Sequence, residues 1–277
     1  MKIRKNYILR KRFNIRKRFN LKIIISGEFE RYKIYEKPVI IPENNGYTGK
    51  RGQAKNQEKS IRQAIKRAKD KIYGYIIANE WEYWATQTFS PKAIDRFNLD
   101  EIVRRYNKRL KNLKQRKYPK LKWLIVPEQH KNGAWHLHAF MSGIPADKVV
   151  YSGYDYFNKK KTFSRRIYNW VDMIDYGFND YLHIGNCNPL ERFKMANYVM
   201  KYITKELAQK RFNKKMYWCS RGLKKPTITN TLTINKEKYI SSTGVIISQG
   251  KYYIKDDNTG EIFNTVNDIT VFNPLPF

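Results

Sequence analysis

Two histidines one residue apart are the best starting point for chemistry in this chain. They stand in Trp135-His136-Leu137-His138-Ala139-Phe140, a run with the aromatic and apolar content of a β-strand. Side chains alternate between the two faces of a strand, so His136 and His138 would project together while Leu137 points to the other face. Two imidazoles on one face are half of a metal site.

A neighbouring carboxylate could complete such a site. Residues 121–128 form a second strand-like segment that ends at Glu128, and residues 131–133, Lys-Asn-Gly, are a turn signal between the two. A three-residue loop pairs Glu128 directly with His136, close enough for one cation to bridge them. A two-residue turn would move Glu128 to the other face, and a surface hairpin with two solvated histidines is the plainer alternative.

A second group of reactive side chains lies on a predicted helix over 189–207, with Asn188 as N-cap, Pro189 at the first position and Glu191 at the third. At 100° per residue, one side gathers Phe193, Ala196, Val199, Met200, Ile203 and Leu207. The other side gathers Tyr198, Lys201, Tyr202 and Lys205. An exposed amphipathic face explains this stripe equally well.

One chemistry needs both groups of residues. A tyrosine oxygen that attacks a phosphodiester requires a cation to polarise the phosphoryl oxygens, and positive charge to favour the phenolate. If the apolar stripe of the helix packed on the sheet, the tyrosines would point away from the histidines. The chemistry therefore requires the Tyr/Lys side to face His136 and His138, with the apolar stripe buried against another element.

These segments resemble the HUH rolling-circle replication initiators of single-stranded DNA phages and small plasmids. Residues 128–138, Glu-Gln-His-Lys-Asn-Gly-Ala-Trp-His-Leu-His, are similar to the metal motif of that family. Residues 198–205 are similar to its nucleophile motif in the two-tyrosine form, and residues 84–90 to the Thr-rich strand before the metal motif. Residues 217–226 also resemble a phage-initiator segment, with no assigned role. The resemblance covers about residues 80–226.

The resemblance implies that Glu128, His136 and His138 hold one divalent metal ion, Mg²⁺ or Mn²⁺. It also implies an α+β fold with a central antiparallel sheet and flanking helices, to which the residue pattern adds a β-rich C-terminal extension.

It further implies a tyrosine nucleophile that forms a 5′-phosphotyrosine bond and releases a 3′-hydroxyl for a polymerase to extend. We expect Tyr202 to act first and Tyr198 second, with Lys201 and Lys205 stabilising phenolate or phosphate charge. A relaxase or single-strand transposase with the same chemistry is the nearest alternative.

The implied partners are single-stranded DNA at a replication origin, either open or folded as a hairpin, and the host helicase and polymerase. No G-x-x-x-x-G-K-[ST] phosphate loop occurs, so the chain is not expected to carry its own helicase. The apolar run 21–25 is too short for a membrane span. We expect no membrane partner and a location in the cytoplasm of the host bacterial cell.

The bulk charge agrees with a nucleic-acid partner. The chain has 56 Lys and Arg against 24 Asp and Glu, a net charge of +32. Residues 1–27 contain no acidic residue and interleave cations with aromatics, which suits contact with single strands as well as it suits a solvated tail. A non-enzymatic nucleic-acid-binding protein is therefore the alternative from another functional class.

Other residues able to bind metals or form disulfides carry weaker signals. His130 would close the hairpin turn rather than face the metal, which leaves a supporting or DNA-contacting role open. His183 and Cys187 have no partners for a zinc site in the sequence. Cys187 and Cys219 give no disulfide framework, which fits a reducing compartment.

The remaining pattern predicts three regions: a basic arm over 1–27, an HUH-like nicking domain over 28–225 and the β-rich extension over 226–277. The expected strands are 21–36, 82–90, 227–234, 239–248 and 252–254, the expected helices are 55–78 and 99–116, and 151–182 is expected to be irregular. Asn98 is the expected N-cap of the helix at 99–116.

Overall fold

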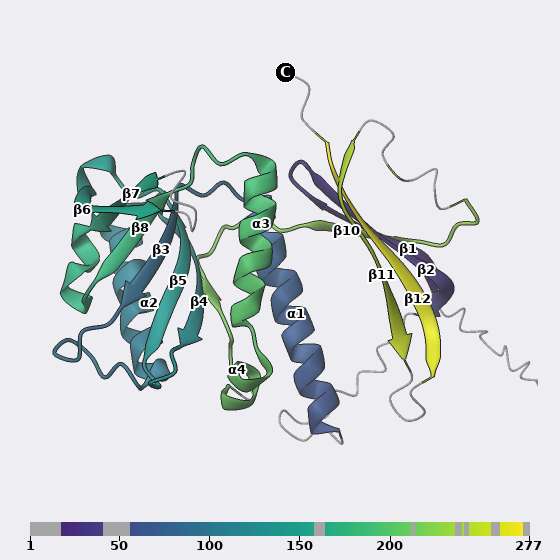
Figure 1. The fold of residues 1–277 in the computed structure, drawn as a ribbon, viewed down its shortest axis with the longest axis horizontal. Coiled ribbons are helices and arrows are strands. Elements are labelled where there is room, and N and C mark those ends of the chain that lie inside the picture. The colour runs from purple at the N-terminus through teal and green to yellow at the C-terminus, as the bar shows by residue number, and fades with distance from the viewer. Residues whose placement is uncertain are drawn as a thin grey trace, which may run out of the picture. The chain divides into compact units, whose positions relative to one another are not determined.

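The computed structural model describes residues 18–40, 56–157, 164–211, 214–235, 240, 244–255 and 261–273. Contacts divide the chain into two compact units (Figure 1). The larger unit contains residues 49–227 together with residues 25–30, and all the candidate site residues fall in it. The smaller unit contains most of the N-terminal strands and the C-terminal strands.

The larger unit is built on a seven-stranded sheet of order β6-β7-β8-β3-β5-β4-β9, whose described pairings are all antiparallel. Its strands are β3 (Tyr83–Thr88), β4 (Lys122–Gln129), β5 (Trp135–Ser142), β6 (Val149–Phe157), β7 (Ser164–Trp170), β8 (Asn179–His183) and β9 (Trp218–Cys219). The short helices η1 (Ala146–Lys148) and η2 (Val171–Tyr176) connect strands at one end of this order. The predicted α+β class with a central antiparallel sheet is confirmed.

The sheet places β5 between β4 and β3, which are the strands that carry the candidate residues. The loop of the β4–β5 hairpin has the three residues that the site required, because the His130 backbone N–H donates to the Ala134 carbonyl at 2.9 Å. Gly133 has φ of 87°, a left-handed conformation that glycine adopts without strain and that ends such loops. Glu128 consequently pairs with His136, and the predicted register is confirmed.

Helix α2 (Leu99–Arg116) covers the sheet face opposite to the histidines. It begins at the predicted N-cap, where Asn98 accepts a hydrogen bond from the Glu101 backbone N–H at 3.1 Å. Its buried side includes Tyr106, whose ring meets that of Phe89 at 5.9 Å, and Asn107, which accepts a hydrogen bond from the Trp123 indole at 3.2 Å. Trp123 lies an odd number of residues from Glu128, so its side chain is on the other face of β4.

The tyrosine segment lies on the histidine face, and it is not the single helix that its periodicity predicts. It consists of α3 (Pro189–Val199), the single turn η3 (Met200–Tyr202) and α4 (Lys205–Lys210). The predicted capping box at Asn188 and Glu191 is present. The helix ends because Ile203 leaves helical geometry with ψ of 79° and Thr204 caps α4, accepting from the Leu207 backbone N–H at 3.1 Å.

Helix α1 (Gln57–Ala78) provides the other element that the apolar stripe needed. It packs against α3, η3 and α4, as Figure 1 shows for the two longer helices. The Phe193 ring meets the ring of Tyr73 on α1 at 6.2 Å, and Ala196, Val199 and Ile203 are buried. The apolar stripe is therefore satisfied without turning the tyrosines away from the sheet.

The smaller unit is a five-stranded sheet of order β10-β1-β2-β12-β11. Its strands are β1 (Arg18–Ser26), β2 (Phe29–Ile40), β10 (Thr227–Thr231), β11 (Val245–Lys255) and β12 (Ile262–Phe272). Leu21, Tyr32, Ile269 and Val271 form its buried cluster. Arg31 binds Asp268 through two hydrogen bonds of 2.7 Å, which ties β2 to the C-terminal strand. The expected β-rich C-terminal extension is present.

Three predictions about individual elements are wrong. The single strand expected over 21–36 is a hairpin, β1 and β2, that turns at Gly27 and Glu28. The irregular region expected over 151–182 instead holds β6, β7 and β8. The C-terminal strands have different bounds, since β11 runs through the expected gap after 248 and β12 was not anticipated.

None of the helices in the described ranges combines the length and apolar composition that a membrane span requires. Most of the basic arm predicted over 1–27 lies outside the described residues, and its last nine residues enter β1 and the turn that follows it.

Gly177 tests how tightly the sheet is braced beside Thr88. Its φ of 127° is in a region that side chains rarely adopt, and an added Cβ would lie 2.5 Å from the Thr88 carbonyl oxygen. We expect Gly177→Ala to lower the free energy of unfolding by about 3 kcal/mol, measured by urea denaturation. Gly153→Ala is the matched control, because Gly153 also has positive φ but an added Cβ there would meet no atom within 4 Å. Its loss should be about 1 kcal/mol, and equal losses for both variants would contradict the packing argument.

Candidate functional site

Two threonines of β3 fix the rings of the two histidines. The register pairs Thr86 with His138 and Thr88 with His136, which puts all four side chains on one face. The Thr86 hydroxyl is 3.2 Å from Nδ1 of His138, and the Thr88 hydroxyl is 3.0 Å from Nδ1 of His136. Because Nδ1 is occupied in both rings, Nε2 is the nitrogen left for a ligand or a proton.

Glu128 already contacts one of these nitrogens. Its Oε2 lies 2.6 Å from Nε2 of His138, a distance at which one proton is shared between an imidazole and a carboxylate. With the proton on Nε2, Nδ1 accepts from the Thr86 hydroxyl. With Nε2 free to bind a cation, Nδ1–H donates to the same hydroxyl. A threonine at this position therefore supports both states of His138.

The surroundings keep both imidazoles neutral. Burial lowers the pKa of His136, and the nearby His130 and His138 lower it further. Burial also lowers the pKa of His138, although its hydrogen bond to Glu128 opposes the shift. His130 stacks on His136 with ring centroids 3.7 Å apart, so the residue expected only to close the turn also packs against the site. Neutral imidazole is the form that binds metals.

Tyr202 reaches this cluster from the opposite side of the cleft. Its ring stacks on that of His138 with centroids 4.4 Å apart, and its hydroxyl donates to the Tyr198 hydroxyl at 2.8 Å. Burial raises the pKa of Tyr202 well above its usual value, and the hydrogen bond to Tyr198 and the charge of Glu128 raise it further. The phenolate is therefore disfavoured in the protein without a bound cation.

The two lysines of the motif lie differently. Lys201 has its ammonium 5.2 Å from the centre of the Tyr198 ring, and it lines the same hollow as Tyr202 and Glu128. Lys205 begins α4 and forms an ion pair with Glu58 of α1 at 3.2 Å. The break after η3 separates the two, so the structure brings Lys201 but not Lys205 to the tyrosine pair.

The donor set fits a divalent cation in its chemistry. Within the described ranges no three His, Cys, Asp or Glu side chains are yet gathered at metal-ligand distances. Glu128, His136 and His138 share one face, however, and the Glu128–His138 contact is a proton-mediated one that a cation can replace. One carboxylate and two imidazoles suit Mn²⁺ and also accept Mg²⁺.

A cavity of about 700 Å³ adjoins the other tyrosine. It is lined by Tyr198 and Met195 from α3, and by Trp84, Thr86 and Asp180 from the histidine face of the sheet. Burial raises the pKa of Asp180. The cavity places apolar and aromatic surface directly beside the two hydroxyls.

The role of the two threonines was not recognised from the sequence, although they belong to the Thr-rich segment that resembles a family strand. Their alternation with Ala85 and Gln87 is visible, but their pairing with histidines about fifty positions away depends on the register between β3 and β5. Nor did the sequence reveal Trp84, whose ring lies within 8° of parallel to that of His138 at 5.3 Å.

The histidine pKa shifts predict acid sensitivity. An unfolded histidine titrates near 6.5, and His136 and His138 have lower values in the folded chain. Their contribution to stability is complete above pH 6.5 and is lost as the pH falls through the folded-state pKa. NMR titration of the imidazole resonances should place both below 6.5, and the melting temperature should fall less between pH 7.5 and 5.5 in the variant with His136→Gln and His138→Gln. A value at or above 6.5 for either ring would contradict this account.

Comparison with known proteins adds one match. Residues 82–207, slightly under half of the chain, match the family model of the replication-associated protein ORF2. The matched range begins next to β3 and ends within α4, so it contains Glu128, His136, His138 and both tyrosines. No curated protein and no solved structure matches the chain. The central part of this protein is thus similar to a family of replication-associated proteins, which supports a role in the initiation of DNA replication.

Proposed function

We propose that this protein is a site-specific endonuclease and strand transferase for single-stranded DNA, which initiates rolling-circle replication through a covalent phosphotyrosine. The observation that carries the proposal is the meeting of three functional groups. The Tyr202 ring stacks on His138 at 4.4 Å, and the same imidazole contacts Glu128 at 2.6 Å. Carboxylate, imidazole and phenol come from three elements far apart in sequence.

In this proposal Glu128, His136 and His138 would hold one divalent cation, Mg²⁺ or Mn²⁺. When bound, such an ion polarises phosphoryl oxygens and offsets the negative charge that disfavours the phenolate. Thr86 and Thr88 keep the two rings in place, and their hydroxyls accept from Nδ1–H while Nε2 binds. The Lys201 ammonium lies where it can neutralise a phosphate beside the tyrosines.

The proposed step breaks one bond and forms one. The Tyr202 oxygen attacks the phosphorus, a bond from that oxygen to the 5′-phosphate forms, and the bond from phosphorus to the 3′-oxygen breaks. The phenol loses its proton and the leaving 3′-oxygen gains one. The Tyr198 hydroxyl accepts the hydrogen bond of Tyr202 and is half exposed, so it is the first acceptor on the way of that proton to solvent.

The pair of hydroxyls at 2.8 Å also fits strand transfer. While Tyr202 holds the 5′-end, Tyr198 can attack a regenerated copy of the site, so that the released 3′-hydroxyl closes the first strand into a circle. The host helicase and polymerase would supply unwinding and synthesis between the two steps.

The first test of this function is covalent capture. A random-sequence pool of single-stranded DNA incubated with the protein and Mn²⁺ should yield a denaturation-resistant adduct, and sequencing the trapped DNA would identify the site. We expect Tyr202→Phe to reduce adduct formation at least about a thousandfold, because the nucleophile is removed. Tyr198→Phe should retain the first cleavage and lose circle formation.

Tyr253→Phe is the control for this experiment, since Tyr253 is an exposed tyrosine of β11 in the smaller unit. It should behave as the unmodified chain. An adduct that persists in the double variant with Tyr198→Phe and Tyr202→Phe would contradict the nucleophile assignment. The absence of any adduct in the unmodified protein would favour a non-enzymatic binding protein.

The second test concerns the threonines. Thr86→Val and Thr88→Val keep the side-chain shape but remove the hydroxyl from Nδ1, so each should weaken Mn²⁺ binding about 10- to 100-fold in calorimetric titration. Thr86→Ser and Thr88→Ser restore the hydroxyl and should recover most of the affinity. If valine and serine variants bind Mn²⁺ equally, the rings are not oriented for metal by these hydroxyls.

A further inference from the structure

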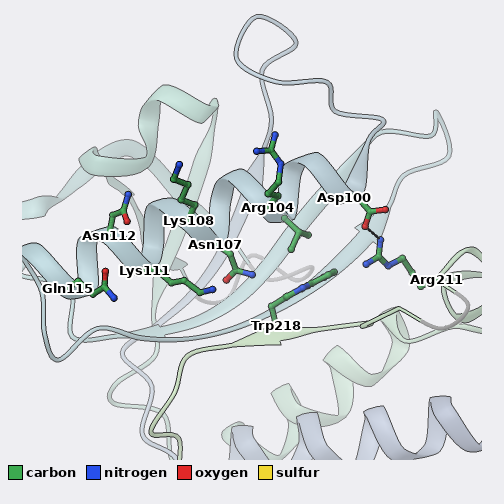
Figure 2. Close-up of a pocket in the computed structure, with 10 residues that line it drawn as sticks. Asp100, Arg104, Asn107, Lys108, Lys111, Asn112, Gln115, Arg211 and Trp218 are labelled. Atoms are coloured by element: carbon green, nitrogen blue, oxygen red, sulfur yellow. Dashed lines mark hydrogen bonds and ion pairs between the residues drawn. The ribbon is translucent and has the colours of Figure 1, made fainter. Parts of the chain in front are cut away.

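The face of α2 that points away from the sheet forms one wall of a polar groove. The groove has a volume of about 520 Å³, and the other wall is formed by Arg211 and Trp218. Figure 2 shows Asn107 and Lys111 reaching from the helix toward the Trp218 ring, while Arg104 and Lys108 extend from its outer side. The α2 residues follow helical spacing, so the groove runs along the helix.

A second hollow continues this groove. It has a volume of about 420 Å³ and shares Asn107, Lys111 and Trp218 with the first. The remaining cations that line it are Arg67 and Lys71 of α1 and Lys214 and Lys215 of the segment before β9. The two hollows together form an extended channel rather than an isolated pocket, and we call it the α2 groove.

The charge of the α2 groove is almost entirely positive. Among the described residues, Arg104, Lys108 and Lys111 form no ion pair, although all three are exposed. The one acidic residue that lines either hollow is Asp100, and it is neutralised by ion pairs with Arg211 and with Lys214, the latter at 2.6 Å. Hydrogen bonds from these two cations lower the pKa of Asp100, so it stays charged and paired.

An aromatic surface lies at the centre of this positive channel. Trp218 pairs with Ile125 in the sheet, and its side chain therefore points to the α2 side. The Arg211 guanidinium lies 5.4 Å from its ring centre. Cations that follow a line, with a tryptophan between them, provide phosphate contacts and a surface on which a base can stack.

The α2 groove is separate from the nicking site. The histidines and Tyr202 lie on the other face of the sheet, and none of the proposed catalytic or metal-binding residues lines the groove. The two regions nevertheless border each other along the chain. Lys210 lines the hollow at Glu128 and Tyr202, and the next residue, Arg211, lines the groove.

We propose that the α2 groove binds single-stranded DNA next to the cleaved site, with phosphates on Arg104, Lys108 and Lys111 and a base on Trp218. This inference rests on the proposed function, because it assigns the groove to the same DNA strand. A strand held at Tyr202 would pass the C-terminal end of α4 and enter the groove there. The groove would then hold DNA during the interval in which Tyr202 is covalently attached to one end.

The test measures DNA binding without cleavage. Fluorescence anisotropy with labelled oligothymidylate of about 20 nucleotides, in the presence of a chelator, gives the dissociation constant as a function of salt. Each phosphate contact on a single strand contributes about 0.7 to the slope of log K against log salt, so the triple variant Arg104→Gln, Lys108→Gln, Lys111→Gln should lower the slope by about 2. We expect its affinity at physiological salt to fall at least about tenfold.

A triple variant of equal charge change is the matched control. Lys92, Lys120 and Lys225 are exposed and line neither hollow, so Lys92→Gln, Lys120→Gln, Lys225→Gln should change the slope by less than about 0.5. Melting temperatures of both triple variants establish that the fold is retained. Equal slope changes in the two variants would overturn the proposal, because net charge alone would then explain binding.

Two further measurements identify the partner. Trp218→Leu should weaken oligothymidylate binding about tenfold with an unchanged salt slope, since it removes stacking and no charge. A greater effect of the groove variant on duplex than on single-stranded DNA would overturn the assignment to a single strand. Because binding is measured without cleavage, a chain that forms no adduct but shows the groove effect would refute the proposed nicking function alone.

Discussion

The register of β5 with its two neighbours is the constraint on which the rest of the site depends. On one side the pairing puts Glu128 opposite His136, and on the other it puts Thr86 and Thr88 opposite the two histidines. A shift of one residue in either pairing would move a complete set of side chains to the face covered by α2. The three-residue hairpin loop and the left-handed conformation of Gly133 hold the first pairing in place.

The interruption of the tyrosine helix meets two packing demands at once. Val199 and Ile203 must be buried, and they pack in the layer between the sheet and α1. Tyr202 must reach the ring of His138, which lies in the sheet. A turn of tighter helix, followed by a non-helical Ile203 and a new N-cap at Thr204, lets the chain change direction between these demands. The same change carries Lys205 away to Glu58.

Local signals explain which parts of the fold and site could be predicted from the sequence. The caps at Asn98 and Asn188 and the loop at residues 131–133 involve neighbours within a few positions, and the structure contains all three. The contacts of Thr86 and Thr88 depend on strand pairing across about fifty residues, which no local pattern encodes. Strands β6 and β7 were missed because they are largely exposed and rich in tyrosine and charge, so they lack the alternation of a half-buried strand.

Bulk charge and local charge act differently in this protein. A net charge of +32 attracts a polyanion over the whole surface, but salt screens exposed charges beyond about 8 to 10 Å. It therefore cannot offset the nearby carboxylate of Glu128, which together with burial disfavours the Tyr202 phenolate. Lys205 is paired elsewhere and Lys201 lies against Tyr198, so the motif lysines do not supply a charge directly at the Tyr202 oxygen. A cation held by Glu128 itself removes the opposing charge at its source, which is why the proposed chemistry needs a metal site even in so basic a chain.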